Sequence, residues 1–418
     1  MSRSLLRVSK TWLELIANMP NLWSNLDFTG ASRPVNLGAV RKYIKRSKGK
    51  VTRATLDRFG ANIEKVPRYI TSRCKELQEL KIPAGYVGSS ILQAAPCASN
   101  LKTLIVSSQC QVTAETAIEI LVHCPNMENA EFWSVTSEDH RWHYQYFSKE
   151  STMPQLRSLT LRSGMPRSHH PLHRARRSLF VNELVRFVPN LRKLSIANWL
   201  VGLFGIDRLN LSNLQNLETL EIPCLHGPWA AGPILPSSLQ YLDMGKCDPF
   251  PADTITWDNA KQLAGLSVAS MIDLKIETLR GWLDSNKGNL TYLDASGCFF
   301  LPVELAELAE QGYLKNVKEL KLNSCDVNDF VAIALSENLP TLTTLHLKYA
   351  KITGFGLKQL VTKLQGTLQY VNVDNCMSMG FDAVEWARSM GVRVAFSLCD
   401  ESKGRKTIRT GYRTVQFY

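Results

Sequence analysis

The side chains in this sequence best suited to chemistry are its clustered histidines. His169, His170 and His173 lie within RSGMPRSHHPLHRARR, residues 162–177, which contains no cysteine or acidic residue. Imidazole is a common zinc ligand, but zinc sites combine several ligands in fixed geometry, and an insertion without cysteine or carboxylate does not supply them. We therefore predict no metal site and no cofactor.

Motifs typical of enzymes are missing from the sequence. It has no G-x-S-x-G, no Walker loop, no H-E-x-x-H and no glycine-rich dinucleotide fingerprint. The ten cysteines include no C-x-x-C pair, and no signal-peptide pattern precedes them, which favours free thiols over disulfides or a structural zinc. The expectation is a non-catalytic protein.

Length and charge further limit the kinds of protein that this sequence can encode. The 418 residues are 44% hydrophobic, enough for a sizeable core, and no window approaches 18 consecutive apolar residues. We expect a protein of the nucleus and/or the cytoplasm, with no membrane partner. The net charge of +12 is local, because residues 33–58, 157–177 and 401–418 together carry +18 and the remainder about −6.

The strongest signal is a repeat of the pattern L-x-x-L-x-L. Its spacing runs from 22 to 35 residues, and all 36 key positions are apolar. This period is typical of leucine-rich repeats. The twelve repeats begin at Leu77, Leu101, Met127, Leu156, Leu191, Leu217, Leu239, Leu263, Leu290, Val317, Leu342 and Leu368.

The repeat predicts one strand per unit, since residues two apart share a face of an extended chain. In VKELKLNSC, Leu320 and Leu322 point inward while Lys321 and Asn323 point outward. A period near 3.6 between strands predicts helices at 115–124, 182–188, 276–283, 303–311, 330–339 and 357–364. The predicted fold is an α/β leucine-rich-repeat solenoid, with parallel strands on the concave face and mostly helices on the convex face; residues 223–238 are expected to form an irregular loop.

Four cysteines share one place in this pattern. Cys247, Cys298, Cys325 and Cys376 each follow the first apolar position of a repeat by eight residues. A small side chain with a weak S–H donor suits the tight turn that leaves a strand. We predict a structural role for them rather than a redox role.

Two sets of residues carry a family resemblance. The segments YLDMGKC, YLDASGC, ELKLNSC and YVNVDNC resemble the cysteine-containing leucine-rich repeats of F-box proteins, and LLRVSKTWLELIANMPNLWSNLDFTG resembles the second half of an F-box leading into the first repeat strand. The overall pattern is similar to fungal members, some of which carry tetratricopeptide repeats ahead of the F-box. The matching F-box residues, facing the adaptor or forming the F-box core, are Leu5, Leu6, Val8, Trp12, Leu22 and Trp23.

The resemblance implies a function. F-box proteins of this type are substrate receptors of SCF ubiquitin ligases, in which the F-box docks on a Skp-type adaptor beneath a cullin and the repeats hold a protein substrate. The first F-box helix of the family has no counterpart here, so we expect that the chain is the truncated start of a longer protein. The alternative for residues 5–19 is a helical cap on the open end of the solenoid.

Four regions follow from this assignment. Residues 1–28 form the F-box remnant or cap, 29–76 a basic and irregular first repeat, 77–399 the solenoid, and 400–418 a basic and aromatic tail. The tail either folds over the end of the solenoid or binds a partner.

Substrate contacts are expected at equivalent outward positions of successive strands. Tryptophan and arginine are enriched in binding hot spots. The same outward strand positions also include Thr160, Ser195 and Ser267. The row runs from acidic in the middle to basic toward the C-terminal side, and for any single residue a solvated strand face is the alternative. The candidates are Trp133, Arg162, Trp199, Glu221, Asp243, Asp294, Lys321, Asn323, His346, Lys348 and Asp374.

Two basic clusters stand apart from this row. RKYIKRSKGK, residues 41–50, suits a nuclear import signal, a phosphate-binding patch, or a helix that buries Val40, Tyr43 and Ile44 and leaves its cations in water. The insertion at 162–177 suits contact with an acidic partner or nucleic acid, or a solvated loop. The cations are Arg41, Lys42, Lys45, Arg46, Lys48, Lys50, Arg174, Arg176 and Arg177.

Three functions remain open from the sequence. The first is the ligase substrate receptor. The second is an interaction scaffold without a ligase. The third is association with nucleic acid or chromatin through the basic clusters, consistent with a pI near 9.2.

Overall fold

The structure is a computed structural model of the chain. It divides into two compact units, Met1–Leu217 and Glu218–Tyr418, which are described separately. The residues it describes are 19–29, 36–56, 65–86, 91, 95, 97–136, 153–163, 184–198, 209–225, 232–247, 255, 260–286, 288–398, 407–410 and 413–416.

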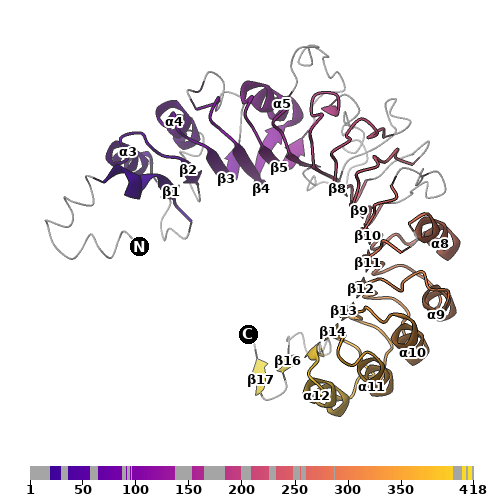
Figure 1. Cartoon of the computed structure of the whole chain (residues 1–418). Coiled ribbons are helices and arrows are strands. Elements are labelled where there is room, and N and C mark those ends of the chain that lie inside the picture. The colour runs from indigo at the N-terminus through magenta and orange to yellow at the C-terminus, as the bar shows by residue number, and fades with distance from the viewer. Residues whose placement is uncertain are drawn as a thin grey trace, which may run out of the picture. The chain divides into compact units, whose positions relative to one another are not determined.

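Unit 1 contains parallel strands joined in chain order (Figure 1). The strands are β1 Asn25–Asp27, β2 Arg53–Thr55, β3 Glu79–Tyr86, β4 Thr103–Thr113, β5 Asn129–Thr136, β6 Ser158–Ser163 and β7 Lys193–Ala197. The helices are the short 3-10 helix η1 Pro20–Trp23, followed by α3 Leu37–Arg46, α4 Lys65–Arg73 and α5 Ala114–His123.

Unit 2 repeats the plan with shorter strands, each three residues long. The strands are β8 Thr219–Glu221, β9 Tyr241–Asp243, β10 Gly265–Ser267, β11 Tyr292–Asp294, β12 Glu319–Lys321, β13 Thr344–His346, β14 Tyr370–Asn372 and β15 Arg393–Ala395. The helices are α8 Ile276–Ser285, α9 Pro302–Glu310, α10 Asp329–Asn338, α11 Gly354–Lys363 and α12 Phe381–Ser389. They lie on one side of the strands and leave the other side open (Figure 1).

The register confirms the repeat pattern. In unit 1 the second leucine positions of successive repeats are partners from Leu80 to Leu194, and in unit 2 from Leu220 to Val371. The 36 key positions are all buried, none more than 5% exposed. Each buried Leu or Ile contributes about 1.5–3 kcal/mol of transfer free energy, opposed by the entropy of ordering the chain. The fold is an α/β leucine-rich-repeat solenoid.

Three strands extend the ladders beyond the pattern. β1 and β2 precede Leu77 and place Leu26 and Ala54 in register with Leu80, and β15 places Val394 beside Val371. The twelve predicted repeats do not include them. The apolar spacing of the repeat nevertheless continues there, because Val51, Ala54 and Leu56, which lie in and beside β2, are all fully buried. The ladder therefore begins at β1, within residues 1–28, and β2 shows that the region expected to be irregular contains a regular strand.

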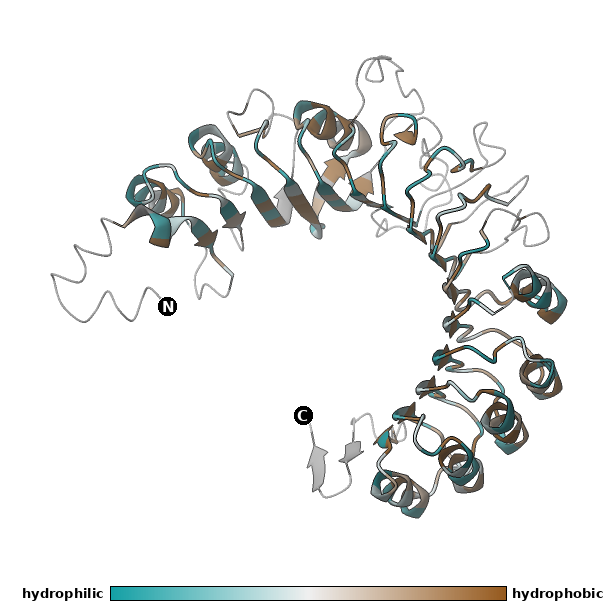
Figure 2. Ribbon diagram, viewed as in Figure 1, coloured by the Kyte–Doolittle hydropathy of each residue, from teal (hydrophilic) through white to brown (hydrophobic). Residues whose placement is uncertain are grey.

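The helical returns match five of the six predictions, at α5 and α8–α11. At 182–188 the described residues 185–187 form a turn, and residues 182 and 183 lie outside the described part. α4 and α12 form where the periodicity predicts no helix, whereas α3 confirms the helix offered for the basic cluster, with Val40 and Ile44 buried and Tyr43 half-buried. Helices α9–α12 show brown and teal stripes in Figure 2, as expected for helices with one face on the sheet.

The cysteine turn recurs through unit 2. The residue before each turn cysteine has positive φ, as at Lys246, Ser324 and Asn375, and its N–H donates to a carbonyl of the next repeat; Ser324 N donates to Lys348 O at 2.7 Å. The cysteine then donates backward, with Cys325 Sγ 3.2 Å from Ala295 O and Cys376 Sγ 3.0 Å from Leu347 O. The turn thus ties three successive repeats together.

The predicted structural role of these cysteines is confirmed. Cys247, Cys298, Cys325 and Cys376 are buried and free. Burial raises the pKa of the Cys298 thiol to about 12 and that of Cys376 to about 11. Thiols of such pKa stay protonated and weakly nucleophilic at neutral pH.

The ends of the chain are described only in part. Residues 1–18, which carry most of the expected F-box helix, lie outside the described residues. At the other end, β16 Thr407–Thr410 and β17 Arg413–Gln416 pair as an antiparallel hairpin. The two-unit division after Leu217 was not anticipated from the sequence.

Candidate functional site

The open side of the unit 2 strands carries two rows of side chains fixed by strand register. The first row runs Glu221, Asp243, Ser267, Asp294, Lys321, His346, Asn372 and Ala395, one residue per strand. The second row runs Thr219, Tyr241, Gly265, Tyr292, Glu319, Thr344, Tyr370 and Arg393. The buried leucine between each pair fixes both residues outward, which brings most of the predicted acidic and basic candidates onto one face. We call it the concave face.

The first half of this face, on β8–β11, is acidic and aromatic. Glu221, Asp243 and Asp294 are its charged members, and no Lys or Arg lies in either row on these strands. Tyr241 and Tyr292 lean over the strand between them, with ring centroids 5.8 Å apart. We call this set the acidic half.

Glycine at position 265 makes the tyrosine contact possible. A Cβ on Gly265 would lie 2.6 Å from Cδ2 of Tyr241, closer than nonbonded carbons approach. The ring therefore occupies the space that any side chain of β10 would need. Ser267, the other residue that β10 contributes to the rows, is only 5% exposed.

Desolvation shapes the acidic half. Burial raises the pKa of Asp243, with smaller contributions from Glu221 and Asp294. Burial also raises the pKa of Tyr241 and of Tyr292, so both phenols stay neutral donors. The carboxylates repel one another on a half-buried surface, an arrangement that an incoming cation would relieve.

Backbone contacts hold the carboxylates in place. Asp243 Oδ1 accepts from Gly245 N at 2.9 Å, and Asp294 Oδ1 accepts from Ser296 N at 3.0 Å. Asn372, in the same row, uses its amide oxygen in the same way toward Asp374 N. An asparagine therefore satisfies this turn as well as an aspartate does.

The second half, on β12–β15, is basic but partly neutralised. Lys321 Nζ lies 3.1 Å from Glu319 Oε1 and 5.0 Å from the centre of the Tyr292 ring. Arg393 lies over the Tyr370 ring at 5.9 Å. We call Lys321 on β12, Arg393 on β15 and Lys348, which lies two residues after β13, the basic half.

His346 differs from expectation. Burial lowers its pKa, and Lys321 lowers it further. The ring packs 5.4 Å from Tyr370. It is thus neutral at pH 7 and adds no charge to the basic half.

Asn323 and Asp374 serve mainly to join repeats. Asn323 Oδ1 accepts from Lys348 N at 2.9 Å, and its amide donates to Ser296 Oγ at 3.1 Å. Asp374 Oδ1 accepts from Ser397 Oγ at 2.7 Å. Both are half-buried, so their polar atoms are largely committed within the protein.

In unit 1 the structure brings two predicted residues together. The Arg162 guanidinium lies 4.3 Å from the centre of the Trp133 ring, and Trp133 Nε1 donates to Glu131 Oε2 at 2.8 Å. The neighbouring row members Thr160 and Ser195 are buried, which corrects the expectation that they face solvent. Trp199 lies outside the described residues.

The described F-box candidates separate into core and surface. Trp23 is 2% exposed and meets Tyr43 edge to face at 5.0 Å, whereas Leu22 is 57% exposed. Leu5, Leu6, Val8 and Trp12 lie outside the described residues, as do Arg174, Arg176 and Arg177. The site role of these residues stays a prediction.

Several surface residues escaped the sequence analysis. Tyr241, Tyr292 and Tyr370 occupy the x position directly before the second leucine, and the repeated YLD of two repeats was the available signal. A second set is apolar and exposed at the first turns of successive helices: Val303, Phe330, Phe355 and Phe381. Exposure of large apolar side chains at matching repeat positions is not visible in the hydrophobic pattern alone.

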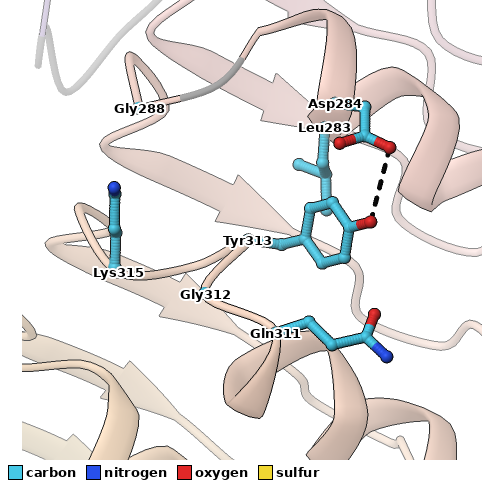
Figure 3. A pocket seen from close by; sticks show the side chains of 7 residues that line it. All are labelled: Leu283, Asp284, Gly288, Gln311, Gly312, Tyr313 and Lys315. Carbon is cyan, nitrogen blue, oxygen red and sulfur yellow. Dashed lines mark hydrogen bonds between the residues drawn. The ribbon is translucent and has the colours of Figure 1, made fainter.

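One cavity of about 260 Å³ lies between the connections after α8 and after α9 (Figure 3). Asp284 Oδ2 accepts from the Tyr313 hydroxyl at 3.3 Å on its wall. Its other polar lining groups are Gln311 and Lys315. It lacks a nucleophile and base pair, and we assign it no chemistry.

Two further observations on the described residues concern metal sites and helices that could cross a membrane. No three His, Cys, Asp or Glu side chains among them are placed to hold a metal ion. None of their helices combines the length and apolar character needed to cross a membrane.

Comparisons with known proteins show no family for this chain. No family model matches the chain, and no curated protein sequence matches it. Similar structures include the complex of Rad7 and Elc1 in yeast, with 16% identity, a TM-score of 0.46 and coverage of 92% of this chain and 94% of that chain. An internalin, inlF, from Listeria monocytogenes has 14% identity and a TM-score of 0.46, covering 86% and 94%. The TLR13–ssRNA13 complex has 14% identity and a TM-score of 0.48, covering 88% of this chain and 52% of that one.

Proposed function

We propose that this chain is a protein-recognition subunit whose concave face binds a segment of a partner protein, and that it acts as the substrate receptor of an SCF-type ubiquitin ligase. One observation carries the recognition role: two registered rows of outward side chains carry opposite charge at their two ends. Such a surface selects partners by charge complementarity.

The acidic half suits a lysine or arginine of the partner. Its carboxylates are half-buried and close to one another, so a partner cation reduces their mutual repulsion. The faces of Tyr241 and Tyr292 attract cations as well, by about 0.5–2 kcal/mol for a stacked contact.

The basic half suits a carboxylate of the same partner. Lys321 lies on β12 in the first row, and Lys348 lies two residues after the end of β13. From β9 to β13 there are four strand steps, which at about 4.8 Å each span roughly 19 Å. An extended peptide covers that distance in about six residues.

The ligase role rests on the resemblance of residues 5–28 to an F-box. The chain offers no catalytic constellation among its described residues, so its contribution would be to hold a substrate near a separate catalytic subunit, which raises the effective concentration of the two reactants. Within that segment, Leu22 offers an exposed apolar contact. This role and the scaffold role share the same concave face.

The recognition role is tested with two peptides of equal composition. The block peptide has four lysines, a Gly-Ser-Gly spacer and four glutamates; the alternating peptide mixes the same lysines and glutamates. Fluorescence anisotropy at low ionic strength should show at least about tenfold tighter binding of the block peptide. Equal affinity for both peptides would remove the recognition proposal.

The ligase role needs a separate experiment. A purified Skp-type adaptor should co-precipitate with the full chain, and the variant Leu5→Asp/Val8→Asp should lose it while still binding the block peptide. Retention of peptide binding without any adaptor binding by the wild type would leave the scaffold role and exclude the ligase role.

A further inference from the structure

The helices α3 and α4 of unit 1 form a strongly basic surface. They pack in consecutive repeats, with Val40 and Ile44 of α3 and Val66 and Ile70 of α4 buried beneath them. Residues 36–50 and 65–78 contain ten cations and one acid, Glu76. The cations are Arg41, Lys42, Lys45, Arg46, Lys48, Lys50, Lys65, Arg68, Arg73 and Lys75.

These cations are available to a ligand. All except the half-buried Arg46 are exposed. Within the described part of the chain, none of the ten forms an ion pair. Lys45 and Arg46 stabilise the C-terminal end of α3 through its dipole, but that local effect does not account for the others.

Two arginines are held in place by aromatic rings. The Arg41 guanidinium lies 5.5 Å from the centre of the Tyr69 ring, which links α3 to α4, and Arg46 lies 5.0 Å from the centre of the Trp23 ring. Ordered cations lose less conformational freedom on binding than free ones do. The surface is therefore partly pre-organised.

We propose that the α3–α4 surface binds the phosphate backbone of a nucleic acid. Regularly spaced phosphates match a broad field of unpaired lysines and arginines without requiring a groove, and binding of this kind is largely independent of sequence. A membrane surface is the less favoured partner, because none of the large exposed apolar side chains in the described residues belongs to α3 or α4, and stable membrane attachment usually adds an apolar anchor to basic charge.

The size of the surface sets the expected salt dependence. α3 has ten residues and α4 nine, so each is about 15 Å long, and neighbouring helices lie about 8–10 Å apart. A patch of this size meets roughly four to six phosphates. The slope of log affinity against log salt should then be about −4 to −5.

The experiment uses the full chain and a fluorescein-labelled duplex DNA of about 20 base pairs, with anisotropy recorded between about 50 and 200 mM NaCl. The test variant is Lys42→Glu/Lys45→Glu/Lys50→Glu, all exposed and unpaired within the described residues. The control variant is Lys261→Glu/Lys315→Glu/Lys318→Glu, three exposed lysines of unit 2 with the same change in net charge.

We expect the test variant to bind DNA at least about tenfold more weakly and with a shallower salt slope, and the control to change affinity less than about threefold. Equal weakening in both variants would mean that net charge alone attracts DNA and would overturn the proposal. So would binding to phosphatidylserine vesicles without binding to DNA, or no DNA binding at the lowest salt. The test variant leaves every residue of the concave face unchanged, so its loss of DNA binding can be distinguished from a loss of block-peptide binding, which tests the proposed receptor function.

Discussion

The two halves of the concave face have the same architecture and opposite electrostatics. In the acidic half, carboxylates lie near other carboxylates, and burial raises the pKa of Asp243. In the basic half, Lys321 is already paired with Glu319 and stacked near Tyr292. The acidic half therefore has more interaction free energy to gain from a partner than the basic half has, since part of the basic charge is satisfied within the protein.

The difference in charge between the two halves arises at the outward strand positions, whose residue types the fold does not dictate. The buried leucines fix the backbone in both halves alike, and the outward positions vary without effect on the core. A solenoid can thus hold a charge gradient at little cost in stability, because each strand contributes only two or three residues to it.

Reversing the acidic half should have the largest effect. Asp243→Lys/Asp294→Lys places two cations where the lysines of the block peptide bind, and like-charge repulsion replaces attraction. We expect about a 100-fold loss in affinity for the block peptide, roughly 2.7 kcal/mol, by fluorescence anisotropy.

The matched control for this reversal lies on the helices of unit 2, on the opposite side of its strands. Glu277→Lys/Glu310→Lys on α8 and α9 changes two exposed acids by the same total charge. It should alter the affinity less than about threefold, as expected for charges far from the peptide. A comparable loss in both variants would contradict a localised site.

Reversing the basic half should have a smaller effect. Lys321→Glu/Lys348→Glu removes the attraction for the glutamate block, but Lys321 is already partly neutralised in the free protein. We expect about a tenfold loss in the same assay. A loss larger than that of the acidic variant would invert our ranking of the two halves.

Removing one charge without changing shape should separate binding from stability. In Asp243→Asn the amide oxygen can keep the bond from Gly245 N, as Asn372 does in its own repeat. The folded-state pKa of Asp243 is raised, so its ionised form weakens the fold once pH exceeds that pKa. The variant should bind the block peptide about fivefold more weakly.

Chemical denaturation tests the other part of this prediction. The free energy of unfolding of Asp243→Asn at pH 7 should stay equal or rise by less than about 1 kcal/mol, since solvent screens much of the repulsion. A marked loss of stability would show that the carboxylate is structural rather than reserved for a partner.

The smallest effect is expected from pH near neutrality. The pKa of His346 is lowered from 6.5, so the ring stays neutral between about pH 8 and pH 7, and the affinity should change less than about twofold. Below that range, Asp243 should take up a proton at higher pH than an ordinary aspartate, and the affinity should fall. A rise in affinity from pH 8 to 7 would indicate a charged His346.

The sequence predicts the parts of this molecule that depend on periodicity. The apolar triplets fix all twelve strands, and the position of Cys325 in its repeat fixes its role in the turn. The same apolar spacing continues before Leu77, at Trp23, Leu26 and Phe28 around β1 and at Val51, Ala54 and Leu56 around β2, so both strands could have been added to the twelve repeats. Alternation along a strand predicts which face of the sheet a side chain points to, but it does not predict how exposed that side chain is. Ser195 and Thr160 are therefore buried against expectation, because neighbouring residues cover them.

The sign of the charge at each end of the concave face was predictable from the sequence, but the degree to which contacts within the protein neutralise that charge was not. The acidic and basic ends of the row follow directly from the positions of Asp243 and Lys348 in their repeats. The pairing of Lys321 with Glu319, the neutral state of His346 and the tyrosine contact over Gly265 depend on distances between strands, which no single repeat contains.

Photocrosslinking with the block peptide tests the central claim most directly. A benzophenone placed at the lysine end should label residues of β8–β11, and one placed at the glutamate end should label residues of β12–β15, as mapped by mass spectrometry. The same labels on both ends, or labels on α8–α12 instead of the strands, would contradict a charge-ordered binding face.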